Sequence, residues 1–148
     1  MIIYADTSAL VKLFVTENHS DITRNTLQRA QALGTGLLTR AELGSALARG
    51  PQRGLISESE AQEARRRLQH VWPTWIHTQM NEDLVAFAES LAWQHTLRGY
   101  DAVHLAAAQI WQEKLERSVT LATFDQDLWE AAPKAGLEAW PEWEPAER

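Results

Sequence analysis

The chain has 148 residues and a formal net charge of −6, from 20 acidic and 14 basic residues, and it contains no cysteine. The absence of cysteine excludes disulfides, thiolate metal sites and a cysteine nucleophile, so any metal must be held by oxygen or imidazole. No apolar run approaches the roughly 18 residues of a membrane span, which predicts a cytoplasmic protein that does not enter a membrane. The length predicts a single domain over residues 1–140, followed by an acidic tail over residues 141–148.

The hydrophobic pattern predicts strands that alternate with helices. Three tryptophans on helical apolar faces are expected in the core: Trp93, Trp111 and Trp129. In chain order, the expected elements are a strand over residues 1–4, helices over 8–15 and 20–33, an apolar piece at 36–38, helices over 39–49 and 57–72, a strand over 75–80, helices over 81–98 and 100–111, a strand over 119–123, a helix over 125–136 and an edge strand over 137–140.

Capping patterns indicate where several of these helices begin and end. Thr39 with Glu42, and Ser57 with Glu60, have the spacing of a capping box. Asn81 is a good N-cap for the helix that follows it. The glycines expected to follow the ends of two helices are Gly34 and Gly99.

Strands separated by helices are typical of an α/β domain with a mainly parallel sheet. In such a sheet, the strand ends that lead into helices lie along one edge. Asp6, Glu42 and Asp125 each follow an apolar, strand-like piece and stand at or within the first turn of the next helix. The topology therefore predicts that these three carboxylates approach one crevice.

Each of these acids also has a purely structural explanation. Asp is a good N-cap, Glu completes a capping box, and the helix dipole stabilises a carboxylate there by about 0.3–1 kcal/mol. Several carboxylates in one crevice, however, repel one another, which raises their pKa values and lowers stability unless a cation neutralises them. Hard oxygen ligands suit Mg²⁺ or Mn²⁺, so the cluster predicts a divalent metal site.

Asp101 follows a helix and a glycine rather than a strand, so spacing alone does not place it in the same crevice. It is either the N-cap of the apolar helix after it or a fourth acid of the site. His104, three residues further on, is either a ligand on the same helical face or a core histidine bonded to a backbone carbonyl.

Four segments resemble, in order and spacing, the signature segments of PIN-domain ribonucleases of the VapC toxin type. They are MIIYADTSALVKLF at the N-terminus, TRAELGSAL about forty residues on, LRGYDAVHLAAA near residue 100 and LATFDQDLWEAA beyond residue 120. The resemblance covers about residues 1–140. It implies a three-layer α/β/α sandwich around a mainly parallel sheet, and a metal-dependent endoribonuclease that is paired with a VapB-type antitoxin.

The resemblance also implies roles for individual residues. Its four acids, as catalytic groups and metal ligands, fall on Asp6, Glu42, Asp101 and Asp125. One or two Mg²⁺ or Mn²⁺ ions there would lower the pKa of a bound water for attack on an RNA phosphodiester, leaving 5′-phosphate and 3′-hydroxyl ends. Neighbouring hydroxyls that would orient the carboxylates or the water are Thr7, Ser8 and Thr123.

Three further residues stand close in sequence to the proposed ligands. Asp127 falls near an additional acid of some family members, with a solvent-facing helix position as the alternative. Arg40 and Arg98 are expected to hold neighbouring phosphates, because divalent cations reverse the sign of the local charge.

The same resemblance implies a homodimer and an antitoxin that covers early helices. We expect the antitoxin at an apolar patch around Leu10, Phe14 and the helix over residues 39–49. Two alternatives remain open: a PIN-fold nuclease that processes RNA without a toxin role, and a non-catalytic RNA- or protein-binding module in which the acids are only helix caps.

Overall fold

The structure is a computed structural model that describes residues 1–145; residues 146–148, the end of the predicted acidic tail, lie outside the described residues. A five-stranded sheet forms its centre, in the order β3-β2-β1-β4-β5, and every neighbouring pair is parallel. The strands are β1 (Ile2–Ala5), β2 (Ala32–Gly36), β3 (Ile76–Thr78), β4 (Thr120–Ala122) and β5 (Glu138–Trp140).

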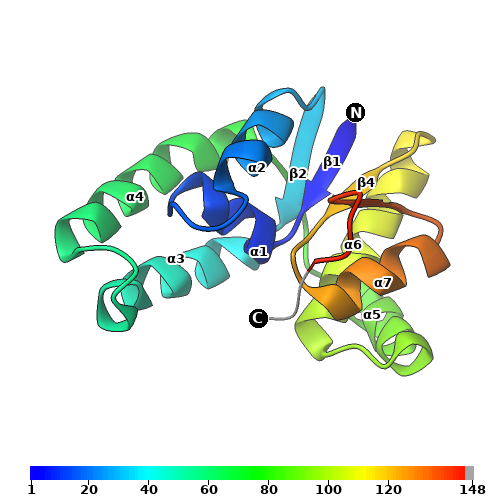
Figure 1. Ribbon diagram of the computed structural model, residues 1–148. Coiled ribbons are helices and arrows are strands. Elements are labelled where there is room, and N and C mark those ends of the chain that lie inside the picture. The colour runs from blue at the N-terminus through cyan, green and yellow to red at the C-terminus, as the bar shows by residue number, and fades with distance from the viewer. Residues whose placement is uncertain (146–148) are drawn as a thin grey trace.

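Helices cover both faces of this sheet, as Figure 1 shows. The α-helices are α1 (Thr7–Leu10), α2 (Ser20–Gln28), α3 (Thr39–Arg49), α4 (Glu58–Val71), α5 (Glu82–His95), α6 (Gly99–Leu115) and α7 (Gln126–Lys134). Short 3₁₀ turns are η1 (Val11–Leu13), η2 (Pro51–Arg53) and η3 (Trp72–Thr74). In the described part of the chain, no helix is both long and apolar enough to cross a membrane.

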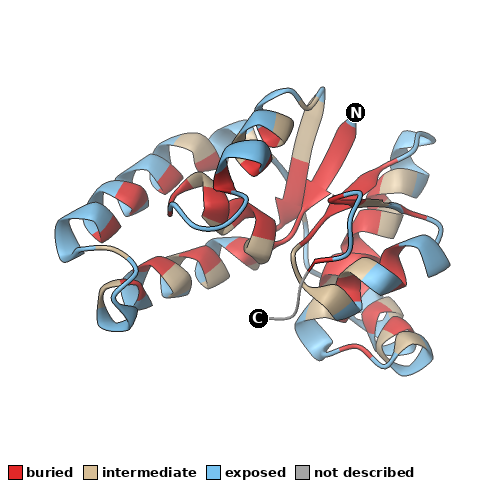
Figure 2. Cartoon of the chain, viewed as in Figure 1, coloured by how far each residue is buried: buried red, intermediate tan, exposed pale blue. Residues whose placement is uncertain are grey.

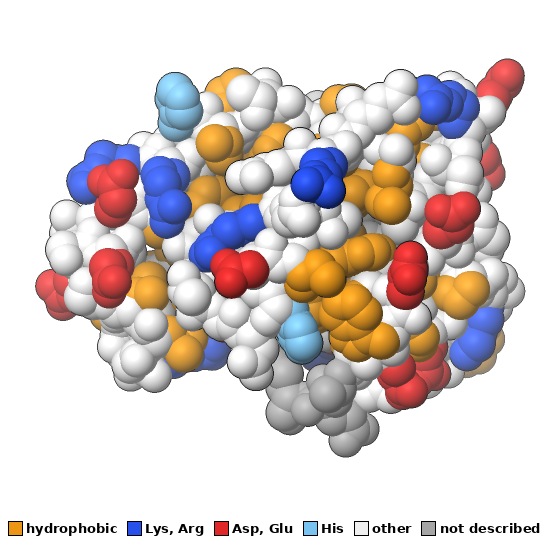
Figure 3. Space-filling view, turned by 45° about the horizontal axis from the view of Figure 1, so that its top comes forward, with side chains coloured by type: hydrophobic (Ala, Val, Ile, Leu, Met, Phe, Trp, Pro, Cys, Tyr) orange, Lys and Arg blue, Asp and Glu red, His pale blue; other side chains and the backbone are white. Residues whose placement is uncertain are grey.

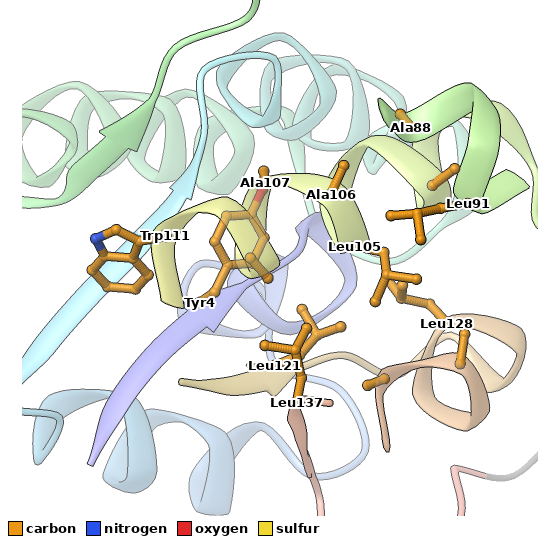
Figure 4. Close-up of a cluster of buried hydrophobic side chains, with 14 of the residues drawn as sticks. Tyr4, Ala88, Leu91, Leu105, Ala106, Ala107, Trp111, Leu121, Leu128 and Leu137 are labelled. Atoms are coloured by element: carbon orange, nitrogen blue, oxygen red, sulfur yellow. The ribbon is translucent and has the colours of Figure 1, made fainter. Parts of the chain in front are cut away.

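Alternate residues of β1 point into two separate hydrophobic cores. Ile2 and Tyr4 pack with α5, α6 and α7, whereas Ile3 and Ala5 pack with α1 to α4. All four are buried, as the continuous red of this strand in Figure 2 shows. Figure 4 shows the first core, in which Tyr4 lies between the sheet and α6. The protein is therefore a three-layer α/β/α sandwich, and the predicted fold class is confirmed.

The strand order creates a switch point between β1 and β4. The chain moves outward from β1 to β2 and β3, then returns to place β4 on the other side of β1. At such a point the connections leave the sheet in opposite directions, which opens a crevice at the carboxyl ends of the two strands. Asp6 directly follows β1, and Asp125 is the third residue after β4, so both stand at this crevice.

Two of the predicted helix starts are confirmed by their hydrogen bonds. Ser57 and Glu60 form a reciprocal capping box at the start of α4. Asn81 accepts a hydrogen bond from the backbone N–H of Leu84 and caps α5. These local signals are read correctly because each is satisfied within four residues of sequence.

The predicted helix over residues 20–33 is wrong at its end. Helix α2 stops at Gln28, and the chain enters strand β2 at Ala32, which pairs with Ile2. Gly34 lies inside this strand and is not a helix terminator. A Cβ at Gly34 would lie 2.8 Å from the ring of Trp111, so the glycine is needed for close packing of β2 against α6.

Three other local predictions are also wrong. Thr39 does not cap α3, because Leu38 holds the N-cap position without a side-chain bond and the Thr39 hydroxyl accepts from Thr35. Helix α5 ends at His95 with Thr96 as its C-cap, at φ of 57°, so Gly99 begins α6 and does not terminate α5. The helix predicted over residues 8–15 is shorter, as α1 followed by η1.

The predicted burial of the three tryptophans holds fully only for Trp111. Trp129 is half-buried, and its indole N–H donates to the carbonyl of Pro141. Trp93, in contrast, is 92 % exposed on α5. An apolar stripe therefore did not distinguish a core face from an exposed one on this helix.

Candidate active site

The carboxylate of Asp6 is buried at the carboxyl end of β1, with a full set of hydrogen bonds. It accepts from the backbone N–H of Ala9, which makes Asp6 the N-cap of α1. The hydroxyls of Ser8 and Thr123 also donate to it, at 2.7 Å each. Burial raises the pKa of Asp6, against the lowering effects of His104 and of these hydrogen bonds. Asp6 is thus both a helix cap and a fixed acid at the switch point.

Residues that precede α7 connect Asp6 to Asp125. The Thr123 hydroxyl that donates to Asp6 also accepts from the backbone N–H of Asp125, at 3.0 Å. The Ser8 hydroxyl similarly accepts from the backbone N–H of Phe124, at 2.7 Å. Asp125 itself caps α7 through Leu128. The ends of β1 and β4 are therefore held together by two small hydroxyl side chains.

Asp101 joins the same site from the first turn of α6. Arg98 donates from Nε to Oδ2 of Asp101 at 2.8 Å and from Nη2 to Oδ2 of Asp125 at 2.5 Å. Burial, followed by the charge of Asp125, raises the pKa of Asp101, and the charge of Asp6 acts in the same direction. Asp101 therefore lies close to Asp125 and Asp6 and is not the N-cap of α6, a position that Arg98 holds.

Glu42 approaches from α3 and is bonded to His104. His104 Nε2 lies 3.1 Å from Oε1 of Glu42, and His104 Nδ1 lies 3.0 Å from the hydroxyl of Tyr4. Burial alone would raise the pKa of Glu42, but the hydrogen bond and the charge of His104 hold it below its usual value. Burial likewise opposes protonation of His104, yet Glu42, Asp6 and Asp101 together raise the pKa of the imidazole.

The site offers oxygen ligands that suit a hard divalent cation. Within residues 1–145, no three His, Asp or Glu side chains are arranged to hold a metal ion as they stand. The buried hydroxyl of Thr7 nevertheless has no hydrogen-bond partner among the described residues, although it lies close enough to Glu42 to lower the pKa of that carboxyl. Four carboxylates and this unpartnered oxygen match the ligand chemistry of Mg²⁺ or Mn²⁺.

The other predicted site residues differ in whether they contact the acids. Asp127 is exposed in the first turn of α7, and its charge helps to raise the pKa of Arg98. Arg40 points elsewhere, because its guanidinium lies 5.7 Å from the centre of the Trp72 ring. Arg98 contacts two of the acids directly, as described above.

The apolar patch expected around Leu10 and Phe14 is wrong, because both side chains are buried in the core. A groove of about 510 Å³ lies beside them instead. Its apolar lining comes from Val11, Val15, Ala46, Leu55, Phe124 and Trp143. Lys12 lies in its wall, where its ammonium donates to Glu17 and lies 4.3 Å from the centre of the Phe124 ring.

Sequence reasoning did not find the role of Tyr4, and it left His104 undecided between two explanations. His104 bonds Glu42 and Tyr4, so it is not a core histidine bonded to a backbone carbonyl. The one signal in the sequence was the pair of polar side chains within otherwise apolar segments, IIYA and AVHLAAA. Such a buried polar group needs a partner, but the sequence does not say which one.

The fold is an α/β/α sandwich, and four acids lie near the switch point of its sheet. A family model described as the PIN domain matches residues 3–134 of the chain. The chain therefore belongs to the PIN domain family. No curated protein matches it.

Several solved structures share this fold at low sequence identity. A toxin–antitoxin complex from Klebsiella pneumoniae has a TM-score of 0.67 and 17 % identity, with coverage of 97 % of this chain and 99 % of that one. FitAcB from Neisseria gonorrhoeae has a TM-score of 0.69 and 19 % identity, covering 96 % and 99 %. VapC20 from Mycobacterium tuberculosis, a toxin that cleaves the sarcin–ricin loop, has a TM-score of 0.64 and 17 % identity, covering 87 % and 94 %.

Proposed function

We propose that the protein is a Mg²⁺- or Mn²⁺-dependent endoribonuclease and the toxin of a toxin–antitoxin pair. Asp6, Glu42, Asp101 and Asp125 would hold the metal and act at the scissile phosphodiester. The observation that carries this proposal is the convergence of these acids from four elements at one switch point. Two solved neighbours, one a toxin–antitoxin complex and the other a toxin that cleaves the sarcin–ricin loop, support it.

The bound cation would supply Lewis-acid stabilisation of charge and a more acidic water. The residues of the chain would do the positioning. Ser8 and Thr123 hold the Asp6 carboxylate with its oxygens fixed, so little reorganisation is needed on binding. Arg98 carries a side chain that is 70 % exposed, so its guanidinium is able to leave the acids and pair with a phosphate of the substrate.

The net charge of −6 does not conflict with an RNA substrate. On the face shown in Figure 3, basic and acidic side chains lie near one another with hydrophobic side chains between them, and they do not separate into fields of one sign. A divalent cation at the acids would make the potential positive where the phosphodiester binds.

An antitoxin is the partner that we propose for the groove of about 510 Å³ lined by Val11, Ala46 and Leu55. An amphipathic helix would place its apolar side chains there. We further propose a homodimer that covers exposed apolar side chains of α5, Trp93 and Val85, and a cytoplasmic location. Light scattering of the purified chain tests the dimer.

The proposed activity is tested with purified protein and a mixed RNA substrate. We expect cleavage with Mn²⁺ or Mg²⁺, no cleavage with EDTA, and products with 5′-phosphate ends. Asp6→Asn should lose activity by at least about 10²-fold while it keeps the fold. Asp83→Asn, an exposed acid of α5, is the matched control and should retain activity. Equal activity of both variants would refute the assignment.

Sequencing of the 5′-phosphate ends that appear after induction in cells without antitoxin would identify the target. Toxicity together with cleavage at few sites supports the toxin role. Cleavage restricted to the maturation of a precursor RNA would favour a processing nuclease instead. The absence of any cleavage would favour a binding module.

A further inference from the structure

A buried chain of three side chains extends from the central strand to the acids. Tyr4 of β1 is fully buried, and His104 of α6 is 5 % exposed. The Tyr4 hydroxyl lies 3.0 Å from His104 Nδ1, and His104 Nε2 lies 3.1 Å from Glu42 Oε1. Three elements are thus linked through one imidazole, and within residues 1–145 Glu42 is the site acid to which this imidazole hydrogen-bonds.

The donors and acceptors of this chain fix the orientation of the imidazole. A carboxylate only accepts, so Nε2 must carry the hydrogen that lies between His104 and Glu42. The backbone N–H of Gly36 donates to the Tyr4 oxygen, and among the described residues the acceptor within reach of the Tyr4 hydroxyl is His104 Nδ1. The Tyr4 hydroxyl can donate its hydrogen to Nδ1 only when Nδ1 carries no hydrogen of its own. Tyr4 therefore favours the neutral tautomer with hydrogen on Nε2.

The sheet makes room for this arrangement at one position. A Cβ at Gly36, at the end of β2, would lie 2.9 Å from the Tyr4 hydroxyl oxygen and 4.0 Å from His104 Nδ1. Glycine at this position lets the hydroxyl reach the imidazole. The Tyr4 and His104 rings also meet edge to face, at 5.9 Å between their centres, which restricts rotation of the imidazole.

We propose that His104 and Tyr4 are positioning residues that hold the Glu42 carboxylate in its orientation toward the metal site. Glu42 comes from a different helix than the other acids and is the acid that this imidazole bonds. Partners behind a metal ligand fix its orientation, and their loss weakens metal binding by about 10–100-fold. The proposal rests on the proposed function, in which Glu42 is a ligand.

Mn²⁺ binding measured by calorimetry on the whole protein tests this role. His104→Leu should weaken binding by about 10–100-fold, whereas His104→Gln, which keeps an N–H donor toward Glu42, should stay within about threefold of the parent. His70→Leu, on the exposed side of α4, is the matched control. In RNA cleavage, His104→Leu should lower kcat more than it raises KM. Unchanged Mn²⁺ affinity in His104→Leu, with loss of affinity in Glu42→Gln, would overturn the proposal and leave the proposed function standing.

A second measurement applies if His104→Leu does not fold. At a pH where the imidazole is neutral, the ¹⁵N spectrum of His104 in the metal-free protein should show hydrogen on Nε2 and none on Nδ1. Tyr4→Phe removes only the hydroxyl and should weaken Mn²⁺ binding, because the imidazole loses one of the two hydrogen bonds that orient it. Unchanged Mn²⁺ affinity in Tyr4→Phe would overturn the role of Tyr4. The proposed function fails if the parent protein binds no Mn²⁺. The positioning role is then tested by the ¹⁵N spectrum of Glu42→Ala: if the hydrogen on His104 Nε2 is unaffected by this substitution, the positioning role is overturned as well.

Discussion

Arg98 donates to Asp101 at 2.8 Å across three residues, and the same guanidinium reaches Asp125, 27 residues further along the chain. One exposed cation therefore pairs with two of the four acids and offsets one of their two negative charges. The Arg98 side chain is 70 % exposed, whereas the side chains of Asp101 and Asp125 are 14 % and 15 % exposed. The guanidinium therefore lies on the solvent side of both acids, and we expect it to compete with a divalent cation for them.

Arg98→Ala should make the protein less stable without metal and more responsive to it. Loss of an exposed ion pair is worth about 0–1 kcal/mol, so the melting temperature in EDTA should fall by about 1–3 °C. The increase in melting temperature on addition of Mn²⁺ should be larger than in the parent, since the cation meets no competing guanidinium. Arg65→Ala, on α4, controls for loss of an exposed arginine. A smaller Mn²⁺ response in Arg98→Ala would contradict this account.

The pH dependence of stability provides a second prediction, at Asp101. Its pKa in the folded protein lies above the ordinary value of 3.8, through burial first and then through Asp125. The folded protein therefore keeps this proton at pH values where the unfolded chain has lost it, so stability falls as pH rises from that ordinary value through the raised one. At neutral pH the ionised carboxylate is destabilising.

Asp101→Asn should consequently raise the free energy of unfolding at pH 7, in EDTA, by about 1 kcal/mol after allowance for solvent screening at this half-buried position. The corresponding rise in melting temperature is about 2–4 °C. Its stability should also change less than that of the parent between pH 4 and pH 7. Thermal melts across this range check both expectations, and a lower melting temperature at pH 7 would count against the predicted repulsion.

Two glycines allow a matched test of the fold. Gly34→Ala would place a Cβ 2.8 Å from the Trp111 ring, inside a packed interface, and should destabilise the protein by about 1–3 kcal/mol. Gly44→Ala, within α3, meets nothing within 4 Å and should stabilise by about 0.5–1 kcal/mol. Urea unfolding of the two variants measures both. The same sign of change in both would show that β2 does not pack on α6 as described.

The groove beside α1 and α3 predicts a separation of antitoxin binding from catalysis. Ala46→Arg introduces a charged side chain into the groove and should weaken binding of the cognate antitoxin by at least about tenfold, because the charge loses water there. RNA cleavage should stay within about twofold of the parent. Ser59→Arg, at the exposed start of α4, is the control in pull-down titrations. Antitoxin affinity that is unaffected by Ala46→Arg would move the partner to another surface.

The sequence predicted the layers of the fold and the position of three of the acids for a physical reason. Local hydrophobic periodicity predicts strands and helices, and in a parallel sheet the residues that follow the strands lie along one edge. This rule locates Glu42, in the first turn of the helix after β2, and it also locates Asp6 and Asp125. Their roles as N-caps, which were the simpler explanation, are also real, since both accept backbone hydrogen bonds. A cap and a site acid are therefore not alternatives here.

The features that the sequence did not predict depend on packing between segments that are distant in the chain. Asp101 reaches the site because α6 lies against the sheet, which its position after a helix and a glycine does not reveal. The link from Tyr4 to His104 spans 100 residues, and the link from Glu42 to His104 spans 62. Gly34 was misread because glycine ends helices and also permits close approach within strands, and only the position of Trp111 decides between them.

The most direct test of the central claim is a calorimetric titration of Mn²⁺ into the metal-free protein, with Asp6→Asn, Asp101→Asn and the control Asp83→Asn measured alongside. The account predicts saturable binding in the parent and in Asp83→Asn, and affinities at least about tenfold weaker in the two site variants. Equal Mn²⁺ affinity in all four proteins, or no saturable binding in the parent, would contradict a metal site built from these acids.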